Sequence, residues 1–190
     1  MPGASRRWGW HRLDHDWARR LVADSGLVEG ALVLDVGAGT GAITAALLDV
    51  GARVIAVEAH PGRAAALRRT FGSSITVVRA DAADLRLPRR PFHVVANPPF
   101  GITTSLLRRL LQPGSRLVGA RLVLQEQAAR RWTGPAAPGR GRWGAHFELT
   151  AGGRVPRRAF HPVPRIDARV VRIAPRRSVS GPRRTGRLRP

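Results

Sequence analysis

Residues 34–41, which read LDVGAGTG, decide the fold of this chain because they join an apolar run to a glycine-rich turn. Residues 31–36 predict a buried β-strand that leads into the turn, and residues 42–49 predict the helix that follows it. Further strands are expected at residues 53–58, 75–81, 92–97, 121–125, 146–152 and 169–175, and helices at residues 14–23, 61–71, 103–111 and 126–131. Strands that alternate with helices predict an α/β protein built on a parallel sheet.

The spacing of the glycines narrows the kind of ligand that this turn could hold. Glycines at the carboxyl end of a first strand let the backbone approach a ligand closely. Gly37, Gly39 and Gly41 are each two residues apart, and Ala42 stands where a dinucleotide fingerprint has its third glycine. The turn therefore predicts a close contact between the backbone and a ligand, and its spacing argues against a pyrophosphate.

Each of the first three predicted strands ends at or near an acidic residue, namely Asp35, Glu58 and Asp81. An acid after the second strand typically hydrogen-bonds a ribose diol. Asp81 is placed to accept from the exocyclic amine of an adenine, and Asp35 lies near the charged part of the ligand. The glycine turn and the three acids in this order are similar to the S-adenosylmethionine site of class I methyltransferases. The alternative is that the glycines form only a tight turn and the acids only cap strand ends.

Asn97 is the only asparagine in the chain and begins the sequence NPPF, residues 97–100, after the fourth predicted strand. In such a fold this turn lies beside the methyl group of the cofactor. The Asn97 amide oxygen and the Pro98 carbonyl can accept the hydrogens of a planar exocyclic amine, which localises the nitrogen lone pair. The prolines stiffen the turn, and Phe100 can stack on the base. We therefore expect Asn97, Pro98 and Phe100 to be catalytic; the alternative is an ordinary Asn-Pro turn.

The composition indicates a single domain with a polyanionic partner. The chain has 190 residues, of which 43% are hydrophobic, and its formal net charge is +21. All 33 of the lysine and arginine residues counted in this charge are arginines. Such a charge favours nucleic acid over an anionic membrane surface. The absence of cysteine excludes disulfides and thiol chemistry. We expect no membrane span and no metal site, and because no apolar signal core begins the chain, we expect a cytoplasmic protein.

Two basic segments depart from the alternating pattern. Residues 130–143 predict a Gly/Pro-rich loop, and residues 176–190 predict a disordered, arginine-rich tail beyond a methyltransferase domain at residues 1–175. Four tryptophans in arginine-rich surroundings could stack on RNA or could pack a short amphipathic segment, and the sequence leaves both open. They are Trp8, Trp10, Trp132 and Trp143. The expected RNA contacts in the loop are Arg130, Arg131, Arg140 and Arg142.

Six motifs together resemble the ribosomal RNA adenine-N6 methyltransferases, which include the Erm-type resistance enzymes and the KsgA-type small-subunit dimethyltransferases. These motifs are VLDVGAGTGAIT (33–44), VIAVE (54–58), RADAADL (79–85), VVANPPFGITTSLLRRLL (94–111), LVLQEQAARR (122–131) and FHPVPRIDARVV (160–171). The resemblance covers roughly residues 8–172. It implies a Rossmann-like class I S-adenosylmethionine-dependent fold, with a mostly parallel seven-stranded sheet and helices on both faces.

The resemblance also implies roles for individual residues. Gly37 and Gly39 would contact the methionine part of S-adenosylmethionine, and Asp35 and Asn97 would lie beside it. Phe160 would close the second side of the target adenine that Phe100 stacks on. The remaining cofactor contacts implied are Glu58 and Ala59 at the ribose, Asp81 and Ala82 at the adenine, and His11 and Leu13 in the opening segment.

The chain departs from the family pattern at both ends. Residues 10–13, WHRL, stand where the family usually has a Gln-Asn-Phe-Leu-like segment, so we expect backbone rather than side-chain contacts there. Few residues follow Asp167, where the family usually continues into a small helical domain. RNA binding is then expected to depend on arginines and to be steeply salt-dependent.

We favour the Erm-type branch, which implies a monomer that methylates N6 of one adenine in 23S rRNA and confers macrolide-lincosamide-streptogramin resistance. The alternatives are a 16S rRNA adenine dimethyltransferase, a methyltransferase with a DNA or protein acceptor, and a non-catalytic RNA-binding relic.

Overall fold

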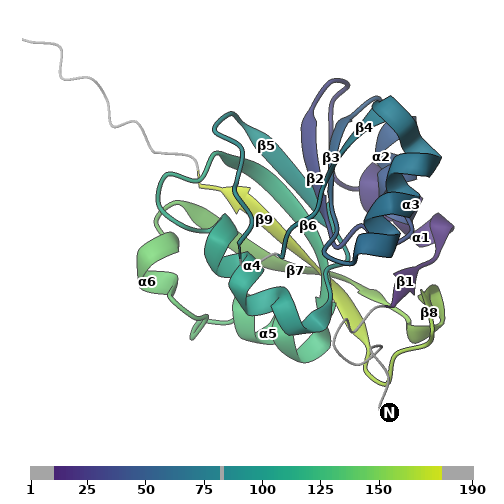
Figure 1. Cartoon of the computed structure of the whole chain (residues 1–190). Helices are drawn as coiled ribbons and strands as arrows, with labels where there is room; N and C mark the ends of the chain where they lie inside the picture. Colours follow the sequence, from purple (N-terminus) through teal and green to yellow (C-terminus); the bar gives the residue numbers. More distant parts are fainter. Residues whose placement is uncertain (1–10, 82–83, 177–190) are drawn as a thin grey trace, which may run out of the picture.

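The computed structural model describes residues 11–81 and 84–176. Seven strands form one sheet in the order β4-β3-β2-β5-β6-β9-β7 (Figure 1). In chain order they are β2 (Leu32–Val36), β3 (Arg53–Val57), β4 (Ile75–Val78), β5 (Phe92–Ala96), β6 (Leu117–Gln125), β7 (Phe147–Val155) and β9 (Ala168–Pro175). The strands from β4 to β6 are parallel, whereas β9 pairs antiparallel with both β6 and β7. The predicted seven-stranded, mostly parallel sheet is confirmed.

Helices cover both faces of the sheet, as the sequence predicted (Figure 1). The first face carries α1 (His15–Ala23), α2 (Ala42–Asp49) and α3 (Pro61–Phe71), and the second carries α4 (Thr103–Leu110), α5 (Glu126–Thr133) and α6 (Arg140–Trp143). Each face has its own cluster of buried apolar side chains. All five residues of β2 are buried, because this strand lies in the middle of the sheet with helices on both sides.

Local sequence fixes where the helices begin. The Asp14 carboxylate accepts a hydrogen bond from the Asp16 backbone N–H and caps α1. His60 caps α3 in the same way, and Pro61 occupies the first turn, where no backbone N–H is required. Leu106, Leu107 and Leu110 give α4 a buried apolar face. No helix in the described part of the chain has both the length and the apolarity to cross a bilayer.

A small second sheet joins segments far apart in the sequence, and the sequence analysis did not predict it. Strand β1 (Arg12–Leu13) pairs antiparallel with β8 (Phe160–His161). Leu13 and Phe160 face each other across this pair and are both buried. The pair holds the first described residues against the end of the molecule where β5 and β6 terminate (Figure 1).

The predicted loop over residues 130–143 is wrong in part. Helix α5 continues to Thr133, and α6 supplies another helical turn from Arg140 to Trp143. Trp132 and Trp143 are buried in the core on this face, and the Trp143 indole N–H donates to the Pro138 carbonyl. Packing, rather than RNA stacking, therefore accounts for these two tryptophans.

Several sequence-based expectations concern residues that the structure does not describe. Trp8, Trp10 and Ala82 lie outside the described residues, and so does the predicted tail beyond Arg176. The division into a domain at residues 1–175 and a tail at 176–190 stays a prediction. The third parallel strand ends at Val78, so Asp81 follows it in a loop rather than ending it as expected.

Candidate active site

The glycine turn after β2 and the NPPF turn after β5 lie in direct contact. Gly37 has φ +77°, and a Cβ placed on it would come within 2.6 Å of Pro99 Cδ. The Gly37 and Ala38 backbone N–H groups donate to the Val57 carbonyl, which fixes the turn against the end of β3. A side chain at position 37 would push the two turns apart, so glycine is required both for backbone conformation and for space.

Glu58 connects the glycine turn to α3. Its carboxylate is buried, with Oε2 accepting from the Gly39 N–H at 2.9 Å and Oε1 accepting from the His60 N–H at 2.8 Å. The Arg63 guanidinium forms an ion pair with Oε1 at 3.0 Å. An ionised carboxylate has about four acceptor positions, so Glu58 retains capacity for a ligand hydroxyl.

A cavity of about 150 Å³ opens beside Glu58. Its walls come from the ends of β2, β3 and β4 and from the NPPF turn, and they consist of Val36, Gly37, Val57, Glu58, Ala59, Arg63, Ala80, Asp81, Pro99 and Ile102. The structure therefore brings together Gly37, Glu58, Ala59 and Asp81, which the sequence predicted to bind one cofactor. A ligand with a polar, hydroxyl-bearing part and a flat apolar part suits this lining.

Asp35 lies on the other side of the glycine turn, and its pKa is unusually high for a carboxylic acid. It is buried and accepts a hydrogen bond from Thr44 Oγ1 at 2.7 Å. Burial raises the pKa of Asp35 to about 7, the nearby Glu58 charge adds to the rise, and the Thr44 hydrogen bonds oppose it. A cationic ligand group beside Asp35 would favour the ionised carboxylate.

A second, smaller cavity of about 20 Å³ joins Asp35 to Asn97. It is lined by Arg12, Leu13, Asp35, Gly37, Ala38, Thr40, Ala42, Ile43 and Asn97. Asp35 and Asn97 thus face one space between the glycine turn and β1. Leu13, expected to contact the cofactor, lies in this lining.

Asn97 is held in one orientation by the backbone of His11. Its Nδ2 donates to the His11 carbonyl oxygen at 2.7 Å. A carbonyl can only accept, so this contact requires the amide nitrogen on that side. Among the described residues no hydrogen bond engages Asn97 Oδ1, and this oxygen is left to accept a hydrogen bond from a substrate.

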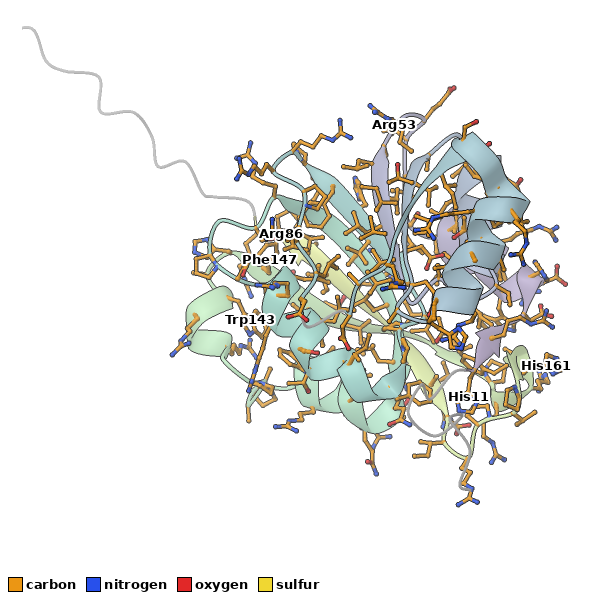
Figure 2. All side chains as sticks on the ribbon, in the orientation of Figure 1. His11, Arg53, Arg86, Trp143, Phe147 and His161 are labelled. Atoms are coloured by element: carbon orange, nitrogen blue, oxygen red, sulfur yellow. The ribbon has the colours of Figure 1, made fainter. Side chains whose placement is uncertain are left out.

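The Phe100 ring stacks on the imidazole of His11, the residue whose carbonyl holds Asn97, with ring centroids 5.6 Å apart and planes at 29°. His11 Nδ1 also lies 2.7 Å from the Pro162 carbonyl oxygen. His11 is labelled at the end of the molecule where β1 and β8 meet (Figure 2). His11 lines neither cavity, and it contacts Asn97 through its carbonyl and Phe100 through its ring. The expected contact of His11 with the cofactor stays a prediction.

The other predicted RNA contacts are a buried aromatic residue next to this site and a group of arginines on α5 and α6. Phe160 is fully buried beside the first face of the sheet, so its ring has no open face for a base in this structure. Arg140 and Arg142 belong to α6, on the opposite side of the molecule from β1 (Figure 1). Arg130 and Arg131 are exposed on α5, and their contact with RNA stays a prediction.

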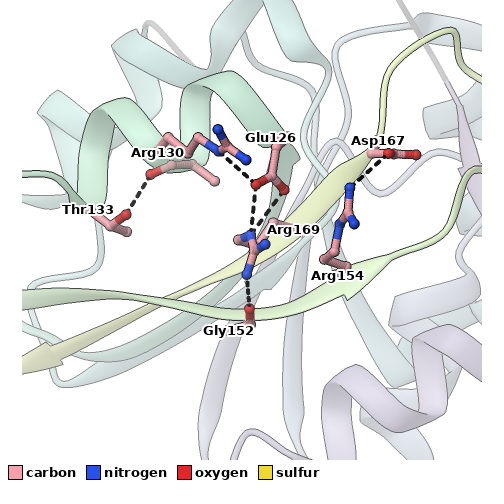
Figure 3. Close-up of polar contacts among 8 residues, drawn as sticks. Glu126, Arg130, Thr133, Gly152, Arg154, Asp167 and Arg169 are labelled. Carbon is pink, nitrogen blue, oxygen red and sulfur yellow. Dashed lines mark hydrogen bonds and ion pairs between the residues drawn. The ribbon is translucent and has the colours of Figure 1, made fainter.

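Glu126 organises the start of α5 (Figure 3). Its carboxylate pairs with Arg130 Nε at 3.0 Å and with Arg169 Nε at 3.0 Å, while Arg169 also donates to the Gly152 carbonyl. Hydrogen bonds from Arg169 and Arg130 hold the pKa of Glu126 below its usual range. The network ties α5 to β9 and β7, so part of the sequence's arginine excess is structural.

The sequence analysis missed Thr44, Arg63, Pro99 and Ile102. Thr44 lies in the first turn of the helix after the glycine turn, and Arg63 lies five residues after Glu58, so both spacings were available as signals. The contact of Pro99 with Gly37 depends on tertiary packing and has no sequence signal. In the described ranges no three His, Asp or Glu side chains gather closely enough to hold a metal ion.

Comparison with known proteins gives consistent matches. Residues 13–184 match the family model of ribosomal RNA adenine dimethylase. Ribosomal RNA small subunit methyltransferase A of Phenylobacterium zucineum (strain HLK1) is 36% identical over 97% of this chain and 69% of its own length. Mycinamicin-resistance protein MyrB of Micromonospora griseorubida is 40% identical over 74% of this chain and 46% of its own length. The crystal structure of 23S rRNA methyltransferase ErmE is similar with a TM-score of 0.76 and 31% identity, covering 88% of this chain and 70% of that chain.

The chain spans roughly half to two thirds of the length of such curated relatives, from 46% to 69%. The family match nevertheless covers the seven strands of the main sheet, the glycine turn, the NPPF turn and the lining of both cavities apart from Arg12. The resemblance drawn from the six sequence motifs is therefore confirmed. This chain belongs to the ribosomal RNA adenine dimethylase family of S-adenosylmethionine-dependent methyltransferases.

Proposed function

We propose that this chain transfers a methyl group from S-adenosylmethionine to N6 of an adenine in ribosomal RNA. The observation that carries the proposal is the fixed amide of Asn97, held through Nδ2 by the His11 carbonyl beside the Phe100 ring. This arrangement leaves a hydrogen-bond acceptor and an aromatic surface together at the end of β5. A planar amine on an aromatic base requires both.

The residues present fit S-adenosylmethionine. Glu58 and Asp81 line the cavity after β3 and β4, where a ribose and an adenine amine would find acceptors. Asp35 lies on the opposite side of Gly37, where its carboxylate would face the ammonium and sulfonium end of the cofactor. When bound, the cofactor supplies an electrophilic methyl carbon on sulfur.

Asn97 and Pro98 would prepare the attacking nitrogen. Asn97 Oδ1 and the Pro98 carbonyl oxygen each accept one hydrogen of the adenine amino group, which turns the nitrogen lone pair out of the ring. The N6 nitrogen would then form a bond to the methyl carbon as the carbon–sulfur bond breaks and S-adenosylhomocysteine leaves. The cationic methylated nitrogen would release one proton to water. Orientation and fixed dipoles account for the acceleration, so no strong base is needed.

Stacking on Phe100 would hold the base in place. The His11 imidazole covers part of this ring, so the target adenine either enters beside His11 or displaces it. An adenine must leave its helical stack or lie in an open loop to reach such a turn. The arginine-rich surface favours RNA through phosphate contacts.

We propose that the target RNA is 23S rRNA and that methylation of one of its adenines confers macrolide-lincosamide-streptogramin resistance. Two similarities support this branch: the mycinamicin-resistance protein has the higher identity of the two curated relatives described, and the 23S rRNA methyltransferase structure is 31% identical. The second candidate is an adenine of small-subunit rRNA, favoured by the name of the relative that matches over 97% of this chain.

The test is the transfer of tritiated methyl groups to purified 23S and 16S rRNA side by side, followed by mapping of the modified base. Label confined to one 23S adenine would support the proposal, and label in 16S rRNA would support the second candidate. Label on DNA or protein would contradict both candidates and identify another acceptor. Cofactor binding without transfer to any of these acceptors would also contradict both candidates. A chain that binds no cofactor would be a non-catalytic relic.

A further inference from the structure

A pocket of about 120 Å³ lies between α1 and the strands β6, β9 and β7, separate from the two cavities already described. One side is apolar and includes Leu13, Trp17, Leu21, Val123, Val155 and Val170. The polar lining consists of four arginines, Arg20, Arg121, Arg154 and Arg172, and one acid, Asp24. Arg154 has its own partner in Asp167, at 3.1 Å, so three arginines face a single carboxylate.

The sheet register forces two of these arginines together. Arg121 on β6 is directly opposite Arg172 on β9 in the antiparallel pair, and both line the pocket. Like charges directly opposite each other on neighbouring strands destabilise a sheet. Burial and the Arg172 charge lower the pKa of Arg121, and Asp24 opposes this only in part. The folded protein therefore keeps an unfavourable pair of cations in one place.

Arg121 also has a donor without an acceptor. Its Nε is buried and makes no hydrogen bond within the described residues, whereas Nη1 donates to the Ala120 carbonyl. A buried donor left unsatisfied destabilises the folded state. A ligand with several anionic oxygens would satisfy this group and screen the repulsion between the two guanidinium groups.

The position of the pocket relates it to the catalytic turn. Leu13 lines both this pocket and the small cavity that Asp35 and Asn97 share. Arg20 and Arg172 are exposed, so the pocket can be reached from solution. A polymer that inserts one base at Asn97 could place a neighbouring part of its backbone on the far side of Leu13.

We propose that this pocket binds a backbone phosphate of the RNA whose adenine enters the active site. The inference rests on the proposed function and assigns Arg121, Arg172 and Arg20 as the phosphate ligands. Guanidinium groups suit this role because their planar donors match phosphate oxygens and remain charged. A net charge of +21 on the whole chain favours a polyanion over a free metabolite.

The test measures RNA binding by Arg172→Gln and Arg121→Gln, with Arg53→Gln as the control. Arg53 is exposed at the amino end of β3, at the opposite end of the molecule from His11 (Figure 2). We expect each pocket variant to bind rRNA fragments roughly tenfold more weakly at low salt. The slope of log K against log salt should become shallower by about 0.7–0.9 for each phosphate that the variant no longer neutralises. Arg53→Gln should retain the wild-type affinity and slope.

Thermal unfolding separates binding from a structural role. Because Arg121 and Arg172 repel each other, Arg172→Gln should unfold at the wild-type temperature or above it, while its RNA affinity falls. Unchanged RNA affinity in both pocket variants would overturn the proposal. A different result would show that the pocket binds a free anion instead. In that case RNA affinity would be unchanged in both variants, and inorganic phosphate would stabilise the wild-type protein but not Arg172→Gln.

Methyl transfer distinguishes failure of this inference from failure of the proposed function. If the wild-type chain methylates rRNA and the pocket variants match it in RNA affinity and in KM, the phosphate site alone is wrong. If the wild-type chain binds cofactor but methylates no RNA, the proposed function is wrong and the inference falls with it. The supporting result is a raised KM for RNA with an unchanged kcat and unchanged cofactor affinity.

Discussion

Asn97 Nδ2 donates a hydrogen bond to the backbone carbonyl oxygen of His11 across 2.7 Å. The acceptor belongs to the main chain, so its presence does not depend on the side chain at position 11. The departure from the family's opening segment therefore leaves this contact in place. The predicted catalytic amide is oriented by a segment in which the sequence analysis expected a cofactor contact.

Replacing Asn97 with alanine tests the catalytic assignment. Asn97→Ala removes the acceptor for the adenine amino group, so kcat should fall by roughly 10²–10³, the typical effect of losing one oriented dipole. Cofactor affinity should remain close to wild type, because Glu58 and the glycine turn are unchanged. Single-turnover methyl transfer and a cofactor titration measure the two effects. The matched control is His11→Ala, which keeps the carbonyl and should retain far more activity; equal losses would contradict the assigned division of roles.

Phe100 should act on substrate binding. Phe100→Ala removes a stacking surface worth about 1–3 kcal/mol per base, so kcat/KM for rRNA should fall by roughly 5- to 150-fold. Phe100→Tyr preserves the ring and serves as the control. Steady-state kinetics with varied RNA checks the prediction, and an alanine variant with wild-type kcat/KM would refute a stacking role.

Asp35 should impose a pH dependence on stability. Its pKa is about 7 in the folded protein and 3.8 as the reference value. The folded state therefore holds a proton that the unfolded chain has already lost. The resulting stabilisation is complete below about pH 4 and is lost as the pH rises through about 7. Asp35→Asn removes the titration, so the wild-type protein should lose stability relative to this variant as the pH rises from about 4 to about 7.

Urea unfolding of both proteins at several pH values measures this difference. The control is Asp49→Asn, because Asp49 is exposed at the end of α2 and its replacement should leave the pH profile of the wild type unchanged. Parallel pH profiles for the wild type and Asp35→Asn would show that Asp35 is not the group responsible.

Gly37 should be less tolerant of substitution than a glycine with similar backbone geometry in open space. Gly37→Ala combines the cost of a positive φ, about 1–2 kcal/mol, with a Cβ 2.6 Å from Pro99 Cδ. Gly26 has φ +67°, and a Cβ added to it would meet nothing within 4 Å, so Gly26→Ala isolates the backbone cost. The free energy of unfolding should fall further for Gly37→Ala, with a loss of cofactor affinity that Gly26→Ala does not show. Equal losses would mean that the contact with Pro99 yields easily.

Short sequence motifs and local hydrophobic patterns were enough to predict most of the main sheet and much of the candidate site. The glycine turn, the acids at Glu58 and Asp81 and the NPPF turn are local signals, and the order of strands along the chain places them at one end of a parallel sheet. The paired strands β1 and β8 have two residues each, too few to show a period. The arginine pair at positions 121 and 172 arises from cross-strand register, and the burial of Trp132 and Trp143 arises from packing. Neither is visible in a single stretch of sequence.

The pairing of β1 with β8 has a consequence for how the protein is made. His11, whose carbonyl orients Asn97, is itself held at Pro162, 151 residues further along the chain. Closing so long a loop is entropically unfavourable until the intervening structure exists, and contacts of such high sequence separation slow folding. During synthesis the predicted catalytic amide would acquire its final orientation only after Pro162 had emerged from the ribosome. A nascent chain stopped before β8 would contain both the glycine turn and the NPPF turn and still lack an ordered active site.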